Sequence, residues 1–147
     1  MINPRQILYD EGRRNAQALR EEAASLTGTE LIARETDVPD FDPEKDYTSW
    51  PRGSALADDG QVWLLQIPHN AAHYPGLRPG TNRACWGLAH TTDPGKAKPW
   101  VAPYGTSGLY MEGECCTWEA RTWKSLADNN AYTPMTQGAE GAWEAVL

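Results

Sequence analysis

The feature that most constrains the fold is a pair of short alternating segments in the last third of the chain. Residues 114–118 and 122–126 alternate apolar and polar side chains around a small polar turn. Alternation with a period of two across a turn predicts a β-hairpin with one apolar, aromatic face. Residues 143–147 begin with the same alternation and are the expected pairing strand. In so small a sheet, large flat side chains must supply most of the buried area.

A weaker copy of this pattern lies upstream. The turn Asp59-Gly60 is a strong two-residue hairpin signal, and residues 62–67 form the strand that follows it. Trp63 then corresponds to Trp123, Trp86 to Trp143 and Tyr47 to Tyr104, at offsets of 60, 57 and 57 residues. A nearly constant offset predicts an internal duplication. The expected structural core of the two units is Trp63, Trp86, Trp123 and Trp143.

Charge argues against nucleic acid as a partner. The chain holds 13 Lys and Arg against 20 Asp and Glu, a net charge of −7. A phosphate backbone is tracked by a basic stripe, and this sequence has none. The first residues lack the basic segment and apolar core of a secretory signal, and no apolar run approaches the length of a membrane span.

The cysteines indicate a reducing compartment. There are three, and Cys115 and Cys116 are adjacent, so in a strand they would point to opposite faces. An odd count without regular spacing matches neither a disulfide framework nor a zinc site. We expect no metal and no cofactor.

Residues 3–26 are predicted to form an N-terminal α-helix. Asn3 is a good N-cap, Pro4 suits the first helical position, and Gly28 follows the expected end. The a and d positions form a narrow seam of mostly small residues. Two interpretations stay open: the helix packs on its own domain, or it self-associates into a homo-oligomer through this seam.

Linkers divide the chain. Residues 35–46 are acidic and carry Pro39 and Pro43, and residues 91–98 contain Asp93-Pro94-Gly95, so both stretches are predicted connectors. The expected organisation is a helical segment with an acidic linker over residues 1–40, then β units at 41–92 and 93–147. The predicted fold class is α+β, with the N-terminal helix followed by two small, mostly antiparallel three-stranded β modules.

No reaction centre is evident in the sequence. His69 and His73 have the spacing of a zinc-protease helix, but Asn70 replaces the catalytic Glu, and an amide cannot act as a general base. Residues 105–108 lack the glycine spacing of a nucleophile elbow. Glu112, Glu114 and Glu119 fall on or beside a small hairpin, where acidic side chains are ordinary surface groups. We expect the protein not to be an enzyme.

Aromatic side chains are the remaining candidates for function. A sugar ring presents apolar C–H faces that match an indole or phenol ring, while its hydroxyls stay in water. The four Trp residues named above are needed as core. The expected exposed, glycan-binding candidates are Tyr74, Tyr110, Trp118 and Tyr132.

The order of aromatics, glycines and strands resembles the small chitin-binding modules of bacterial chitinases. Its features are Tyr110, Gly113, Cys116, Trp118, Trp123, Pro134 and residues 143–146, and they recur less fully in Gly60, Trp63, Pro75 and Trp86. The overall layout, with the loop at residues 69–76 and Pro79, is also similar to prophage tail proteins of Gram-positive hosts. The aromatic pair that forms the sugar platform of the chitinase modules is missing, since those positions hold Ala127 and Asp128, or Ile67 and Pro68.

The resemblance implies a non-enzymatic phage or prophage tail or baseplate accessory with carbohydrate-binding-module-like domains that contact glycan on the host cell surface. The alternative is a purely structural tail assembly or spacer protein that has lost sugar binding. The implied partners are other tail proteins and cell-surface carbohydrate. The implied location is the bacterial cytoplasm before assembly and the virion tail afterwards.

Overall fold

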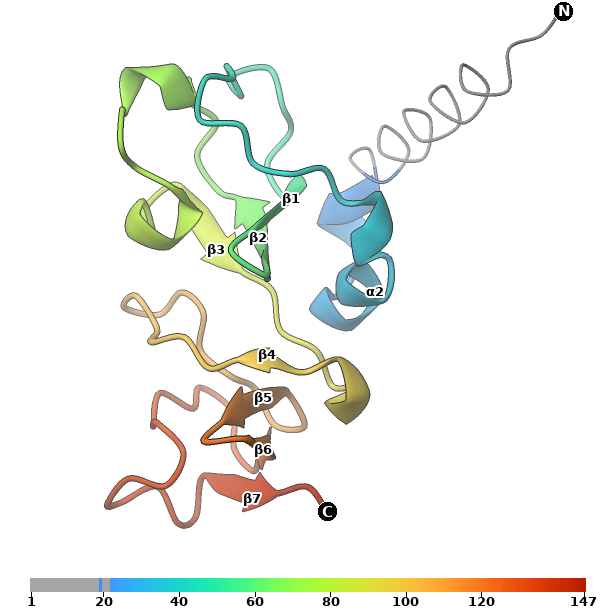
Figure 1. The fold of residues 1–147 in the computed structure, drawn as a ribbon, viewed down its shortest axis with the longest axis vertical. Helices are drawn as coiled ribbons and strands as arrows, with labels where there is room; N and C mark the ends of the chain where they lie inside the picture. Colours follow the sequence, from blue (N-terminus) through green and yellow to red (C-terminus); the bar gives the residue numbers. More distant parts are fainter. Residues whose placement is uncertain (1–18, 20–21) are drawn as a thin grey trace, which may run out of the picture.

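A computed structural model describes residues 19 and 22–147 as two small β-sheets that follow one another along the long axis of the molecule (Figure 1). The first sheet has the strand order β1-β2-β3, and both of its pairings are antiparallel. The second has the order β4-β5-β6-β7, in which β4 pairs parallel with β5 and the other pairings are antiparallel. The strands are β1 (Ala55–Asp58), β2 (Gln61–Leu65), β3 (Trp86–Leu88), β4 (Lys98–Pro99), β5 (Cys115–Trp118), β6 (Arg121–Ser125) and β7 (Trp143–Ala145).

Helical structure in the described residues is short. The α-helix α2 (Gly28–Ala33) has 6 residues and begins at a capping box. In this box the Thr27 hydroxyl accepts from the Glu30 N–H at 3.2 Å, and the Glu30 carboxylate accepts from the Thr27 N–H at 3.0 Å. The 3₁₀ turns are η1 (Ala23–Ser25), η2 (Glu35–Asp37), η3 (Ala71–His73), η4 (Pro79–Thr81) and η5 (Pro94–Lys96).

The predicted α+β class, with a helix before two three-stranded modules, is wrong. The described residues are mostly β, with helical structure limited to residues 19 and 22, α2 and the 3₁₀ turns, and the second sheet has four strands. Most of the helix expected at residues 3–26 lies outside the described residues. The fourth strand arises because the expected linker enters the sheet: the Trp100 N–H donates to the Thr117 carbonyl at 3.0 Å. Pro99 fits there because an edge strand tolerates a residue without an N–H.

The first sheet is covered on both faces. Because side chains alternate along β2, Trp63 and Leu65 face one cluster while Val62 and Leu64 face another. Aromatic loop residues cover the Trp63 side, and the helical turns that precede the sheet cover the Val62 side. Figure 1 shows these helical turns beside the first sheet. The second cluster contains Leu19, Ala23, Leu31, Ile32, Val38, Ala55, Val62 and Ala89. The described part of the N-terminal segment therefore packs on the first sheet.

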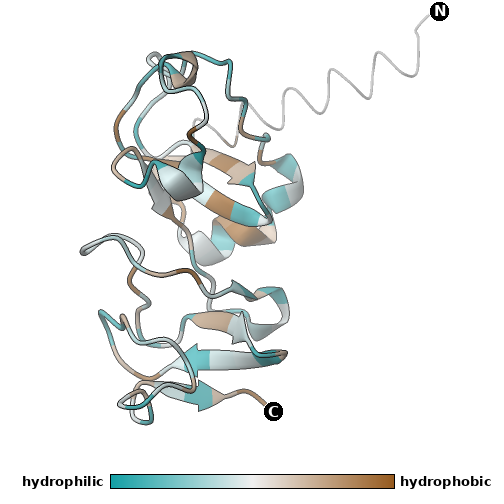
Figure 2. Cartoon of the chain, turned by 60° about the vertical axis from the view of Figure 1, so that its left-hand side comes forward, coloured by the Kyte–Doolittle hydropathy of each residue, from teal (hydrophilic) through white to brown (hydrophobic). Residues whose placement is uncertain are grey.

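The second sheet has one principal apolar cluster. Trp123 packs toward Trp143 and Tyr110, whereas its neighbour Lys124 is exposed and pairs with Glu144 at 3.6 Å. Hydrophobic colouring is accordingly stronger on the strands of the first sheet than on those of the second (Figure 2). One face of a small antiparallel sheet can remain in water when its side chains are polar.

The same contacts recur in both units. The indole N–H of Trp63 donates to the Asp58 carbonyl at 3.2 Å, and that of Trp123 donates to the Trp118 carbonyl at 3.2 Å. Each unit also buries a tyrosine edge-on against the tryptophan of its last strand. These pairs are Tyr47 with Trp86, at 5.6 Å between ring centroids, and Tyr110 with Trp143, at 5.1 Å.

The predicted match of Tyr47 with Tyr104 is therefore wrong. Tyr110 takes the place of Tyr47, because the hydroxyl of each tyrosine accepts a hydrogen bond from a backbone N–H in the segment that leads into its unit. The donor is Asp42 at 2.9 Å for Tyr47 and Val101 at 3.4 Å for Tyr110. Tyr104 is 56% exposed, whereas Tyr47 is fully buried.

The two units are joined through a contact region between the sheets. The Cys115 N–H donates to the Thr91 carbonyl at 2.7 Å, and the Gln61 side-chain amide donates to the Pro99 carbonyl at 2.9 Å. The His90 ring, which is buried, stacks on Tyr110 with 3.7 Å between centroids. The connector between the units is thus part of the packed structure.

Candidate functional site

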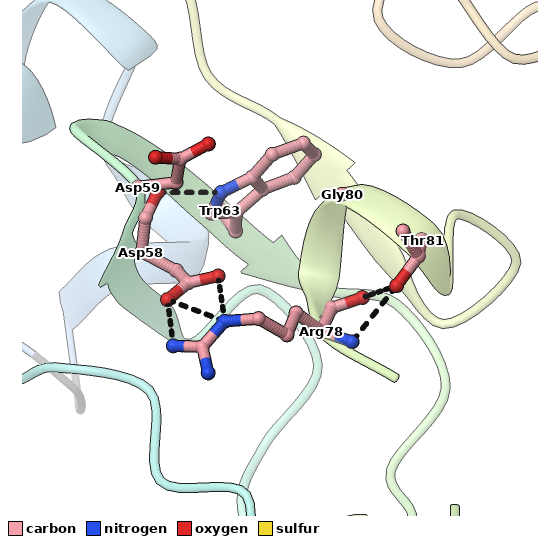
Figure 3. Close-up of a pocket in the computed structure, with 6 residues that line it drawn as sticks. All are labelled: Asp58, Asp59, Trp63, Arg78, Gly80 and Thr81. Atoms are coloured by element: carbon pink, nitrogen blue, oxygen red, sulfur yellow. Dashed lines mark hydrogen bonds and ion pairs between the residues drawn. The ribbon is translucent and has the colours of Figure 1, made fainter. Parts of the chain in front are cut away.

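Two hollows lie at matched places beside the central strands of the two sheets. The first has a volume of about 490 Å³ and adjoins Trp63 on β2. The second has a volume of about 350 Å³ and adjoins Trp123 on β6. The first is lined by Asp58, Asp59, Trp63, Arg78, Gly80 and Thr81 (Figure 3), and the second by Trp123, Met135, Thr136, Gln137, Ala139, Glu140 and Trp143.

The loop before the last strand forms the outer wall of each hollow. In the first unit the Trp86 N–H donates to the Asn82 carbonyl at 3.2 Å, and in the second the Trp143 N–H donates to the Ala139 carbonyl at 3.3 Å. Both pairs keep the 57-residue offset of the two tryptophans. The same offset places Met135 in the position of Arg78. The two hollows are therefore built by equivalent parts of each unit.

Charged groups dominate the rim of the first hollow. The Arg78 guanidinium donates through Nε to both Asp58 carboxylate oxygens, at 3.2 and 3.0 Å, and through Nη2 to one of them. This forked pairing is visible in Figure 3, where the Asp59 carboxylate lies on the adjacent turn. Hydrogen bonding to Asp58 raises the pKa of Arg78. Thr81 closes the wall: its hydroxyl accepts from the Arg78 N–H at 2.9 Å.

The indole of the first hollow is covered. Trp63 is only 3% exposed. A Cβ on Gly80 would stand 3.6 Å from its Cζ2 atom, so the Gly80 backbone lies against the ring. The Arg83 guanidinium carbon lies 5.4 Å from the ring centroid, within the range of a cation–π contact. Little of this ring is accessible to a ligand.

In the second unit, apolar residues take the positions of the charged pair, and of the two only Met135 lines the hollow. Trp118 stands at the end of β5 as Asp58 stands at the end of β1, and Met135 takes the position of Arg78. Trp118 packs edge-on against Trp100 with 5.6 Å between centroids. Trp118 and Trp123 are both partly exposed, and Met135 is 60% exposed. This hollow presents aromatic and thioether surface at the solvent boundary.

The four sequence-predicted ligand residues do not form one surface. Tyr74 is 45% exposed in the loop of the first unit, where its ring meets that of buried His69 at 5.6 Å. Tyr132 is 53% exposed, and its Cε1 atom would lie 3.7 Å from a Cβ on Gly138, beside the second hollow. Trp118 lies near Trp123 in the same unit.

Tyr110 is the correction among these residues. It is 1% exposed and packs between Trp143 and His90, so its ring offers no face to a glycan. Burial raises the pKa of its hydroxyl well above the usual range. Of the four predicted core tryptophans, three are buried (Trp63, Trp86 and Trp143), and Trp123 is partly exposed.

The other titratable side chains considered in the sequence analysis pair with backbone groups or lie at the surface. Within the described residues, no group of three or more His, Cys, Asp or Glu side chains is arranged to hold a metal ion. His69 donates through Nδ1 to the Ile67 carbonyl at 2.8 Å, and His73 lies on the exposed turn η3. Burial raises the pKa of Glu114, whose carboxylate accepts from the Met111 N–H at 2.6 Å. Glu112 and Glu119 lie exposed at the surface.

Sequence reasoning missed most of the lining of both hollows. Asp58, Arg78 and Met135 carry no motif, and their roles depend on contacts across the unit. One signal was available: applying the offset of Trp86 and Trp143 to the preceding loop pairs Arg78 with Met135. The offset of Trp63 and Trp123 likewise pairs Asp58 with Trp118.

Comparisons with known proteins gave no relative: no protein-family model matches the sequence, and no curated protein matches it. No helix within the described part of the chain combines the length and apolar character that a membrane crossing requires. The geometry of the hollows therefore carries the functional argument.

Proposed function

We propose that this protein is a non-enzymatic accessory of a phage or prophage tail or baseplate, and that its β units bind glycan on the host cell surface. The observation that supports glycan binding is the partly exposed indole of Trp123. It lies in a hollow whose rim carries Thr136, Gln137 and Glu140. An apolar ring face bordered by hydrogen-bonding groups suits a sugar, whose C–H face packs on the ring while its hydroxyls reach the rim. The tail assignment rests on the sequence resemblance.

The alternative function is a purely structural tail assembly or spacer protein. Two observations favour it: the first hollow has its indole covered, and its rim pairs Asp58 with Arg78. The positions of the chitinase sugar platform also lack aromatic rings, since they hold Ala127 and Asp128 in the second unit. Binding measurements decide between the two functions.

The test is co-sedimentation of the full-length chain with insoluble chitin, cellulose and purified Gram-positive cell walls. Under the proposal, at least one of these polymers retains the protein, and Tyr132→Ala weakens the retention. Tyr104→Ala is the matched control, because both tyrosines are more than half exposed but only Tyr132 lies against Gly138, beside the second hollow. Retention no greater than that of serum albumin on all three polymers would refute glycan binding and leave the structural alternative.

A further inference from the structure

Resting on the proposed function, we infer that glycan binding is confined to the second hollow and that the ion pair of Asp58 with Arg78 closes the first. The two hollows are built alike, so the side chains exchanged between them decide what each can bind. Three positions differ in this way. Trp118 takes the position of Asp58, and Met135 takes that of Arg78. Trp100 takes the position of Phe41. Arg78 lies over Phe41 at 5.5 Å, while Trp118 meets Trp100 at 5.6 Å.

Accessibility of the indole separates the two hollows. Trp63 is 3% exposed beneath Gly80 and Arg83, although its hollow is the larger. Trp123 is partly exposed, and no glycine covers it, because Gln137 takes the position of Gly80. A sugar needs an open ring face for stacking. The second hollow leaves part of its tryptophan exposed, whereas the first leaves almost none.

The charged pair also makes the first hollow costly to occupy. The Asp58 side chain is 8% exposed, and its two oxygens already accept three hydrogen bonds from Arg78. A ligand that displaced Arg78 would leave the buried carboxylate of Asp58 without its partner, which is unfavourable. The hydrogen-bonding capacity of this rim is therefore used within the protein.

Met135 supplies an exposed apolar side chain to the second hollow. It has φ of 66° and is 60% exposed. Asp59, which lines the first hollow, also has a positive φ, of 51°, so backbone conformation does not distinguish the two hollows. The difference lies in the side chains, because the second hollow offers a thioether beside Trp123 where the first offers charged groups.

The ligand class follows from the lining of the second hollow. The surface that faces solvent combines indole and thioether groups with the hydroxyl of Thr136, the amide of Gln137 and one carboxylate, Glu140. It includes no cation, so an acidic sugar would lack a partner and would meet Glu140. An uncharged hexopyranose, stacked by its C–H face with hydroxyls toward the three polar groups, is the ligand that this lining suits.

Titration calorimetry on the full-length chain tests the inference, with N-acetylchitohexaose, cellohexaose and a soluble peptidoglycan digest as probes. We expect one site per chain. We also expect Met135→Gly to weaken binding at least tenfold, while Asp59→Asn changes it less than twofold. Met135→Gly is informative because glycine suits φ of 66°. The variant therefore removes the side chain without destabilising the fold, as its thermal unfolding will show.

The possible results are distinguishable. Two sites per chain, or equal losses from Met135→Gly and Asp59→Asn, would overturn the confinement to the second hollow and leave glycan binding intact. Binding that survives Met135→Gly unchanged would also overturn it. No binding by any of the three probes would refute glycan binding itself, and the inference with it.

Discussion

Protonation of His90 should loosen the contact between the two units. Its ring is 8% exposed, stacks on Tyr110, and donates through Nε2 to the Gly108 carbonyl at 2.8 Å. Burial, chiefly, lowers the pKa of His90 from 6.5 to about 4, and the nearby Arg83 cation acts in the same direction. The folded protein therefore holds this ring neutral at pH values where the unfolded chain protonates it.

The sign and size of the effect follow from linkage. Above pH 6.5 His90 is neutral in both states, and its ionisation does not alter stability. Between pH 6.5 and about 4 the unfolded chain binds more protons than the folded protein, so stability is lost as the pH is lowered. At about 1.4 kcal/mol for each pH unit, the loss reaches about 3 kcal/mol. A cation–π contact of the protonated ring with Tyr110 would offset about 1 kcal/mol of this. We expect a net loss of about 2 kcal/mol.

The assay is urea unfolding, followed by tryptophan fluorescence, at intervals from pH 8 to pH 4. In His90→Gln the side-chain amide can still donate to Gly108 but does not titrate in this range. The unfolding free energy of the variant should therefore fall by about 2 kcal/mol less than that of the parent. Glu114, whose pKa is raised, opposes the loss at acidic pH equally in both proteins, so it cancels in the comparison.

His73→Gln is the matched control, since His73 is exposed on the turn η3. It should show the pH dependence of the parent protein. Parallel pH profiles for the parent and His90→Gln would show that the contact region does not exclude the charged ring, and the reasoning about this region would be refuted.

Three further perturbations test the turns, the packing of α2 and the buried thiols. Ala120 and Gly60 are turn residues with positive φ, 60° and 73°, a conformation that favours glycine. Ala120→Gly should therefore raise the unfolding free energy by about 1 kcal/mol, and Gly60→Ala should lower it by a similar amount. Melting temperatures of both variants equal to that of the parent protein would contradict this. Gly28→Ala would place a Cβ 2.1 Å from the His90 carbonyl oxygen. We therefore expect the free energy of unfolding in urea to fall by about 1 to 3 kcal/mol. A fall below about 0.5 kcal/mol would refute this close packing. Burial raises the pKa of Cys116 to about 12, so its thiol should react with iodoacetamide only after unfolding; labelling of Cys116 in the native protein, read by peptide mass spectrometry, would contradict its burial.

Local patterns in the sequence were sufficient to place most strands. The Asp59-Gly60 turn predicted the first hairpin, and Asp58 pairs with Gln61 across that turn. The alternation at residues 114–126 predicted the second hairpin, in which Trp118 pairs with Arg121. These elements depend on near neighbours, so turn residues and side-chain alternation specify them.

Features that depend on distant contacts could not be obtained in this way. Strand β4 forms only because Lys98–Pro99 meets β5, and a two-residue parallel edge leaves no periodic pattern. The pairing of Tyr47 with Tyr104 failed because the two units differ in loop length between this tyrosine and the following glycine. That glycine is Gly53 after Tyr47 and Gly113 after Tyr110. Burial of Tyr110 then removed one predicted ligand residue.

Indole N–H signals in ¹H–¹⁵N NMR spectra give the most direct test of glycan binding at the second hollow. Each of the 7 tryptophans contributes one signal, which can be assigned by single Trp→Phe substitutions. On titration with the three soluble probes, the signal of Trp123, which lines the second hollow, should shift while those of Trp63 and Trp86 stay in place. A spectrum in which Trp63 shifts as much as Trp123, or in which no indole signal moves at millimolar sugar, would contradict the account.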